Sequence, residues 1–477
     1  MAPGVVLSEG FEGGAHRDCR DSDHGGGALK LRDVALYCGK DGSMEQERAN
    51  GLDFDPRRPR IATVCLFALV VIFAATFAFE FKLAAEKFLG LISGQSSPVA
   101  AARSLPRVEV GLLVTGAVMA AALLGRWSHA KWADGLGVEA VAASARGEDR
   151  TISVRGSAIR VFATWLVTAA IASIGREAAI IEGSGAFGSV LGRKTGGRGD
   201  ALAAAGIAAG FAAAYHAPIA AVLYLDEHLN VRNSKRGSLF TISGAAAGYW
   251  FSTRVLGGHP IFQARSVAKT SSIAIGALIA LVPAVLGARI FLEVRVRFAP
   301  NMVTERSRAQ LLISTLALAV LAGVSVAVFR DAAGNGMEAL RSTAGTATIG
   351  LAVALAFGKL VGTTAALASG VPGGVLTPTL SVAAGFALLA SFGLSAVGIA
   401  PVSPWTITIA AMAVGLTVGL RSPLMAIVMV PELVGDYSLI PVIAAVVAAA
   451  WLIDRQIDRF LVHVGQRLPD GIHDEDG

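Results

Sequence analysis

The residues Gly175, Arg176 and Glu177 place an ionisable pair inside a region that is otherwise apolar. Keeping a carboxylate charged in such a region costs roughly 3 kcal/mol on insertion scales, so it normally faces a partner or an ion pathway. The apolar segment that follows, from Ala178 to Val190, is too short to span a bilayer and is preceded by a glycine-containing turn, so a helix is predicted to begin at this point inside the membrane. A charged helix start within an apolar region therefore indicates an ion path.

A second segment of this kind runs from Gly370 to Pro378 and reads Gly-Val-Pro-Gly-Gly-Val-Leu-Thr-Pro. Its glycines allow a ligand to approach the backbone, and its prolines fix the turns. The unpaired amides at a helix start attract anions, by up to about 2 kcal/mol when partly buried. We therefore expect the amides of Ala178, Val375 and Leu376 to bind a small anion without a full positive side chain, weakly enough for it to leave.

The elements that position these residues are predicted to be membrane helices. Hydrophobic residues make up 54% of the 477 residues and charged residues only 16%. Apolar runs of the length needed to cross a bilayer recur from Ile61 to Trp451, and no strand periodicity competes with them. The chain is predicted to be an all-α polytopic membrane protein.

The net charge of +6 does not indicate a nucleic-acid partner, because arginine and lysine gather at the ends of the apolar runs. The positive-inside rule then places both termini in the cytoplasm.

Internal repetition divides the chain into two halves. The segment 210–222 matches 415–427, and Pro423 and Glu432 recur at the same offset from Pro218 and Glu227. Paired halves with interrupted helices are typical of transporters whose half-helix ends meet near the midplane. The predicted organisation is a polar, disordered cytoplasmic tail (1–56), a first membrane repeat (57–262), a second membrane repeat (263–466) and a short cytoplasmic tail (467–477).

Three stretches resemble signatures of the CLC family of chloride channels and proton-coupled anion antiporters. They are Gly175 to Glu177, Gly374 to Pro378 and Ala209 to Glu227, in the family's order and spacing. The resemblance covers about 60 to 465 and implies a CLC-type fold of two inverted-topology repeats with broken, partly re-entrant helices. It also implies a homodimer with one anion path per subunit. In such a path Glu177 occupies the outer anion site when ionised and swings away when protonated, as gate and proton carrier.

The chain departs from the family pattern at several positions. Leu136 stands where the family has a serine whose hydroxyl touches the central anion, and Glu182 stands where glutamine is common. No tyrosine occurs between Trp451 and Val464, where the family often supplies a phenol. With both hydroxyls absent, the central site is expected to rest on amides alone and to bind halide weakly, which keeps fluoride open as the substrate.

The inner proton relay is predicted at His228 or Glu227. His228 matches the second carboxylate of the family's Ile-Glu-Glu motif, and an unperturbed imidazole titrates near pH ~6.5. The alternative is that His228 only caps a helix end. Glu227 and Glu432 are alternatively structural residues that hold loop amides, which is the preferred interpretation for Glu432. The small residues Gly206 and Gly210 are expected to pack between the repeats.

The predicted function is transmembrane transport of chloride or a related small monovalent anion, coupled to protons, in a bacterial inner membrane. The predicted anion-binding residues are Gly175, Arg176, Ala178, Gly374, Val375, Leu376 and Leu136. The alternatives are a passive channel of the same fold and a fluoride exporter. An intramembrane enzyme built on Asp226, Glu227 and His228 near His216 is disfavoured because neither a His-Glu-x-x-His nor a Gly-x-Ser-x-Gly pattern is present. No cofactor or metal is expected; the expected partners are the anion, protons, the bilayer and a second copy of the chain.

Overall fold

The structure is a computed structural model that describes residues 60–148, 151–194, 199–231, 235–262, 270–299, 307–345, 347–399 and 402–467. By its internal contacts the chain divides into two units. One is Asp55–Asp454; the other combines Met1–Phe54 with Arg455–Gly477, of which only the end of the last helix is described. The predicted tail at 1–56 lies outside the described residues, as does the predicted tail at 467–477 apart from the backbone of its first residue.

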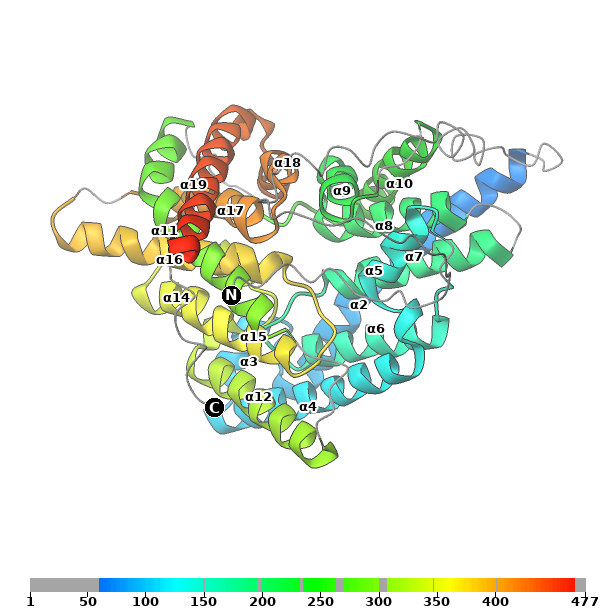
Figure 1. Ribbon diagram of the computed structural model, residues 1–477, viewed down its shortest axis with the longest axis horizontal. Helices are drawn as coiled ribbons and strands as arrows, with labels where there is room; N and C mark the ends of the chain where they lie inside the picture. Colours follow the sequence, from blue (N-terminus) through cyan, green and yellow to red (C-terminus); the bar gives the residue numbers. More distant parts are fainter. Residues whose placement is uncertain are drawn as a thin grey trace, which may run out of the picture. The chain divides into compact units, whose positions relative to one another are not determined.

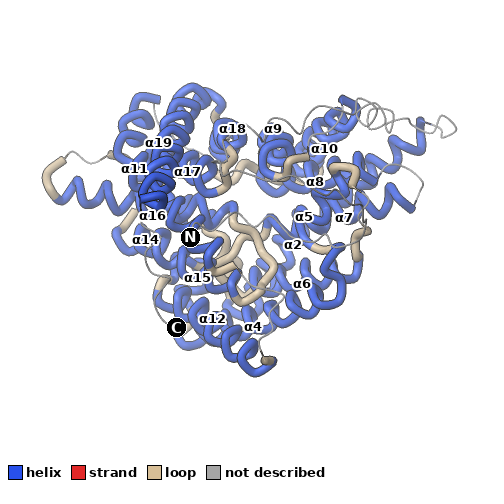
Figure 2. Tube along the Cα trace, viewed as in Figure 1, coloured by secondary structure: helices blue, strands red, loops and turns tan. Residues whose placement is uncertain are grey.

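Helices make up most of the described chain, and Figure 2 shows helices and connecting loops without a strand. The first half contains α2 (Arg60–Ser93), α3 (Pro98–Ser104), α4 (Arg107–Trp132), α5 (Gly137–Ala145), α6 (Val154–Ala169), α7 (Glu177–Lys194), α8 (Gly199–Tyr215), α9 (Pro218–Leu223), the π-helical turn η3 (Tyr224–His228) and α10 (Lys235–Arg254). The second half contains α11 (Thr270–Arg297), α12 (Arg308–Val328), α13 (Met337–Ser342), α14 (Ile349–Val353), the π-helical turn η5 (Ala354–Gly358), α15 (Lys359–Ala368), α16 (Leu376–Ala396), α17 (Pro404–Gly419), α18 (Pro423–Val434) and α19 (Ile440–Arg467). The all-α prediction is confirmed for the described residues.

Seven helical segments within the described ranges are long and apolar enough to cross a bilayer. Their outer faces carry exposed apolar side chains such as Leu91 and Leu278. These faces suit contact with lipid, whose tails are as apolar as leucine. Other helices are shorter, among them α8, α17 and α18.

Small residues let α8 pack closely against its neighbours. It contacts α7, α10 and α2, and these helices gather around it in Figure 1. A Cβ added at Gly206 or Gly210 would overlap atoms of Ser184 on α7. The prediction that these two glycines pack between the repeats is therefore wrong, because their partner is a helix of the same half.

Both halves make the same backbone bend before a short helix. His216 has φ 53° and Arg421 has φ 54°, the left-handed region that non-glycine residues rarely adopt. In each half a proline then begins the helix, Pro218 for α9 and Pro423 for α18. The α9 and α18 helices contact each other, so the two bends bring corresponding elements of the halves together.

Candidate functional site

Glu177 is the first residue of α7, and its carboxylate reaches the start of α16. Its Oε1 accepts a hydrogen bond from the Leu376 amide at 2.6 Å. The Tyr215 hydroxyl donates to Oε2 at the longer distance of 3.3 Å. Glu177 is only 3% exposed. A carboxylate oxygen thus accepts the hydrogen bond of an amide at a helix N-terminus, and a free anion would otherwise bind at that amide.

Two glycine-containing loops hold these helix starts together. The Gly175 amide donates to the Gly374 carbonyl at 3.0 Å, and the Gly374 amide donates to the Gly175 carbonyl at 2.8 Å. A Cβ at either position would overlap the Glu177 side chain. Both positions therefore need glycine, because only a backbone without a side chain leaves room for the carboxylate beside this bridge.

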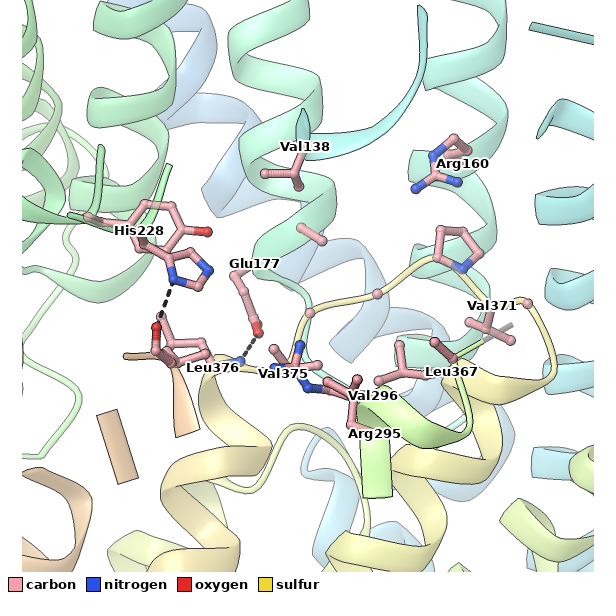
Figure 3. A pocket seen from close by; sticks show the side chains of 18 residues that line it. Val138, Arg160, Glu177, His228, Arg295, Val296, Leu367, Val371, Val375 and Leu376 are labelled. Carbon is pink, nitrogen blue, oxygen red and sulfur yellow. Dashed lines mark hydrogen bonds between the residues drawn. The ribbon is translucent and has the colours of Figure 1, made fainter. Parts of the chain in front are cut away.

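A cavity of about 470 Å³ lies beside Glu177. Of the predicted anion-binding residues, its lining includes Ala178, Gly374, Val375 and Leu376 and does not include Gly175, Arg176 or Leu136. Leu136 precedes α5, and its near neighbour Val138 lines the cavity instead. Figure 3 shows Glu177, Val375 and Leu376 together at this cavity. The two helix starts predicted from the sequence, those of α7 and α16, thus line the same cavity.

His228 lines the same cavity from η3. Its Nδ1 donates to the Leu420 carbonyl at 3.2 Å, a bond drawn in Figure 3. A carbonyl can only accept, so this bond assigns the proton to Nδ1 and leaves Nε2 as the nitrogen that can take up a second proton. His228 therefore has both an anchoring contact and access to the space that contains Glu177.

An aromatic column packs between these two titratable residues. The ring centroids of Tyr215 and Phe211 are 4.9 Å apart, those of Phe211 and Tyr224 are 4.7 Å apart, and those of Tyr224 and His228 are 5.0 Å apart. Tyr215 also donates to Glu177, so the column joins the Glu177 carboxylate to the His228 ring. No sequence pattern singled out these rings, because they come together only through the contact of α8 with η3.

Glu227 caps a helix of the other half. Its two carboxylate oxygens accept the amides of Leu424 at 3.0 Å and Met425 at 2.8 Å, at the start of α18. These are amides that the first helical turn leaves without partners. The carboxylate is therefore committed to capping, and Glu227 does not form a catalytic group with Asp226, whose side chain is exposed.

Glu432 makes the corresponding contacts in the opposite direction. It accepts the amides of Ile219 at 3.0 Å and Ala220 at 2.9 Å, at the start of α9, and a hydrogen bond from the Tyr437 hydroxyl at 3.1 Å. The interpretation of Glu432 as a structural residue is confirmed. The repeat predicted that the two glutamates are equivalent but did not predict that each caps the other half's helix.

Two arginines that the sequence did not assign to the site also line the cavity, Arg160 on α6 and Arg295 on α11. The Arg160 Nε donates to Glu182 Oε2 at 3.2 Å, and Glu182 Oε1 accepts the Gly137 amide at 3.0 Å. Tyr224 is a further lining residue. The cavity lining therefore includes charged side chains that the sequence analysis did not assign to it. Glu182, a carboxylate inside an apolar segment, was the signal that a cationic partner was near.

Comparison with known proteins places the chain among membrane transport proteins. A sequence profile described as "Voltage gated chloride channel" matches residues 110–455. The H(+)/Cl(-) exchange transporter ClcA of Yersinia pestis bv. Antiqua (strain Angola) is 29% identical over 255 residues, 50% of this chain and 52% of that protein. ClcA of Salmonella agona is 28% identical over 265 residues, 53% of this chain and 55% of that protein. The chain thus spans about half the length of the curated relatives it matches.

Two solved structures share the fold at 18% identity. A slow cyanobacterial Cl-/H+ antiporter has a TM-score of 0.66 and is matched over 86% of this chain and 99% of its own. A CLC-type fluoride/proton antiporter has a TM-score of 0.62 and is matched over 84% and 98%. The predicted CLC-type fold is confirmed, and with its apolar helices the chain is a multi-pass membrane protein. Because the matching profile covers most of the chain, the chain belongs to the voltage gated chloride channel family.

Proposed function

We propose that this protein carries chloride or a related small monovalent anion across a membrane in exchange for protons, with Glu177 as gate and proton carrier. The observation that carries the proposal is the Glu177 carboxylate bound to the Leu376 amide at the start of α16. An ionised carboxylate and a free anion compete for that amide. A proton on Glu177 removes its charge, weakens its hold on the amide and admits the anion, so one group couples the two movements.

The anion ligands in this proposal are the amides of Ala178, Val375 and Leu376. In this proposal Gly175 and Gly374 do not bind the anion. They leave room for the Glu177 carboxylate, because a Cβ at either position would overlap it. Amides bind a halide less firmly than a full charge does, and a permeating ion has to leave each site it enters. Arg176 and Leu136 lie outside the cavity lining, so their proposed roles are limited to shaping the loops beside it.

His228 is the proposed inner proton relay. It lines the cavity that contains Glu177, and its Nδ1 bond to Leu420 leaves Nε2 available for a proton. Glu227 is the weaker candidate, because both of its oxygens accept amides of α18.

The proposed setting is a homodimer in the inner membrane, with both termini in the cytoplasm and with inverted repeats at 57–262 and 263–466. The matching bends at His216 and Arg421 support the repeats, as does the exchange of helix caps by Glu227 and Glu432. The antiporters that match this chain in sequence and fold support exchange over passive conduction.

Fluoride is the second candidate substrate. Leu136 gives the start of α5 a hydrocarbon side chain where a hydroxyl is usual, and one of the matching structures is a fluoride/proton antiporter. The test is anion efflux from liposomes that contain the purified protein, recorded with chloride-selective and fluoride-selective electrodes. Efflux of either anion whose coupling to protons is lost in Glu177→Ala supports the proposal and identifies the substrate. Absence of both fluxes from folded protein would overturn it.

A further inference from the structure

Arg295 is a cation at the cavity, and within the described residues its side chain forms no ion pair. It lies on the last turn of α11, is half-buried, and lines the same cavity as Val375 and Leu376; Figure 3 labels all three. Its Nε atom is buried, and its N–H donates to no acceptor within the described ranges, where no ion pair involves the Arg295 side chain either. A buried donor of this kind normally has a partner, which can be an ion.

Arg160, the other arginine in the lining, is in a different state. Glu182 pairs with its Nε at 3.2 Å and is itself 2% exposed. The charge of Arg160 is therefore balanced inside the protein. The Glu177 carboxylate is in turn bound to the Leu376 amide. Of the two arginines that line the cavity, Arg295 is the one that forms no ion pair within the described residues.

We propose that the Arg295 guanidinium binds the transported anion inside the cavity. This would be a second binding site in the same cavity as the amides at the start of α16. A guanidinium is always charged and offers several N–H donors, and charge-assisted hydrogen bonds to an anion are among the strongest in proteins. The cavity of about 470 Å³ has room for an anion with water, since one water occupies about 30 Å³ in the liquid. This site rests on the proposed function and deepens it, because it names the group that attracts the anion to the path.

The chain offers a matched control for this charge. Arg297 lies two residues further along α11, is exposed and does not line the cavity. The variants Arg295→Gln and Arg297→Gln remove one positive charge each from the same helix end. Arg295→Lys keeps the charge but loses the planar group, and it remains informative if the glutamine variant fails to fold.

The experiment is calorimetric titration of purified protein in detergent with chloride and with fluoride. We expect Arg295→Gln to weaken anion affinity about tenfold or more, as loss of a hydrogen bond to a charged group implies. Arg295→Lys weakens it less, and Arg297→Gln leaves it unchanged. The loss persists in a Glu177→Ala background. Unchanged affinity in Arg295→Gln, equal losses in both glutamine variants, or a loss that disappears without Glu177 would each overturn the inference.

Liposome flux separates this inference from the proposed function. Affinity that depends on Arg295 in a protein that moves neither anion supports the binding site and rejects the transport function. Anion flux whose coupling to protons requires Glu177, together with an anion affinity that does not depend on Arg295, supports transport and rejects the second binding site.

Discussion

Replacing Glu177 with alanine is expected to raise the affinity of the protein for its anion. In the structure the Glu177 carboxylate accepts a hydrogen bond from the Leu376 amide at 2.6 Å. The hydrogen bond from the Tyr215 hydroxyl, at 3.3 Å, is longer and contributes little to holding the carboxylate. A hydrogen bond to a charged group contributes about 1.5–3 kcal/mol. Removing this internal competitor frees the amide, and that energy corresponds to a gain of about 10- to 150-fold in affinity.

The assay is the titration of purified protein with chloride and with fluoride over a range of pH. In the wild-type protein affinity rises as pH falls, because protonated Glu177 no longer competes for the amide. Glu177→Ala starts from the higher affinity and loses most of that pH dependence. Glu177→Gln keeps the shape of the side chain without its charge and is expected between the two.

Glu80→Ala is the matched control, because Glu80 is exposed on α2 and its loss removes the same charge. Its affinity is expected to equal that of the wild-type protein. The competition between carboxylate and anion would be refuted if Glu177→Ala kept the wild-type melting temperature but bound the anion equally or more weakly.

Three further predictions use other contacts. Glu432→Ala is expected to lower stability by roughly 1–2 kcal/mol, as loss of a helix cap does; Glu227→Ala costs less because Glu227 is half-buried. Thermal unfolding in detergent measures both, and equal melting temperatures for Glu432→Ala and wild type would contradict the capping. His228→Asn keeps a donor for the Leu420 carbonyl but cannot relay a proton, so proton flux should fall to background while anion flux continues; undiminished proton flux would exclude His228. Gly374→Ala places a methyl group where the Glu177 carboxyl lies, so titration should show a raised anion affinity like that of Glu177→Ala; wild-type affinity would speak against the close approach.

Much of the site was predictable because it depends on local sequence. Glycine before a charged residue predicted a helix start at Glu177, and α7 begins there. The second start was predicted within the segment from Gly370 to Pro378, and α16 begins there, at Leu376, with Val375 as its N-cap residue. Both depend on conformational preferences of a few neighbouring residues, which the sequence displays directly.

The contacts that cross the chain were not predictable in the same way. Arg295 reads in the sequence as an ordinary basic residue at the end of an apolar run. Only the packing of α11 against α15 and α16 brings it to the cavity. The same holds for Tyr215, whose hydroxyl meets Glu177 because α7 and α8 pack closely. The periodicity of apolar residues predicts which face of a helix is buried. It does not predict which other helix packs against that face.

The most direct test of the account is proton movement driven by an anion gradient in liposomes that contain the purified protein. An outward gradient of chloride or fluoride should draw protons into the liposomes against their own gradient, and Glu177→Ala should abolish this movement while anion flux continues. Anion flux without proton uptake in the wild-type protein would contradict exchange and leave a passive channel gated by Glu177.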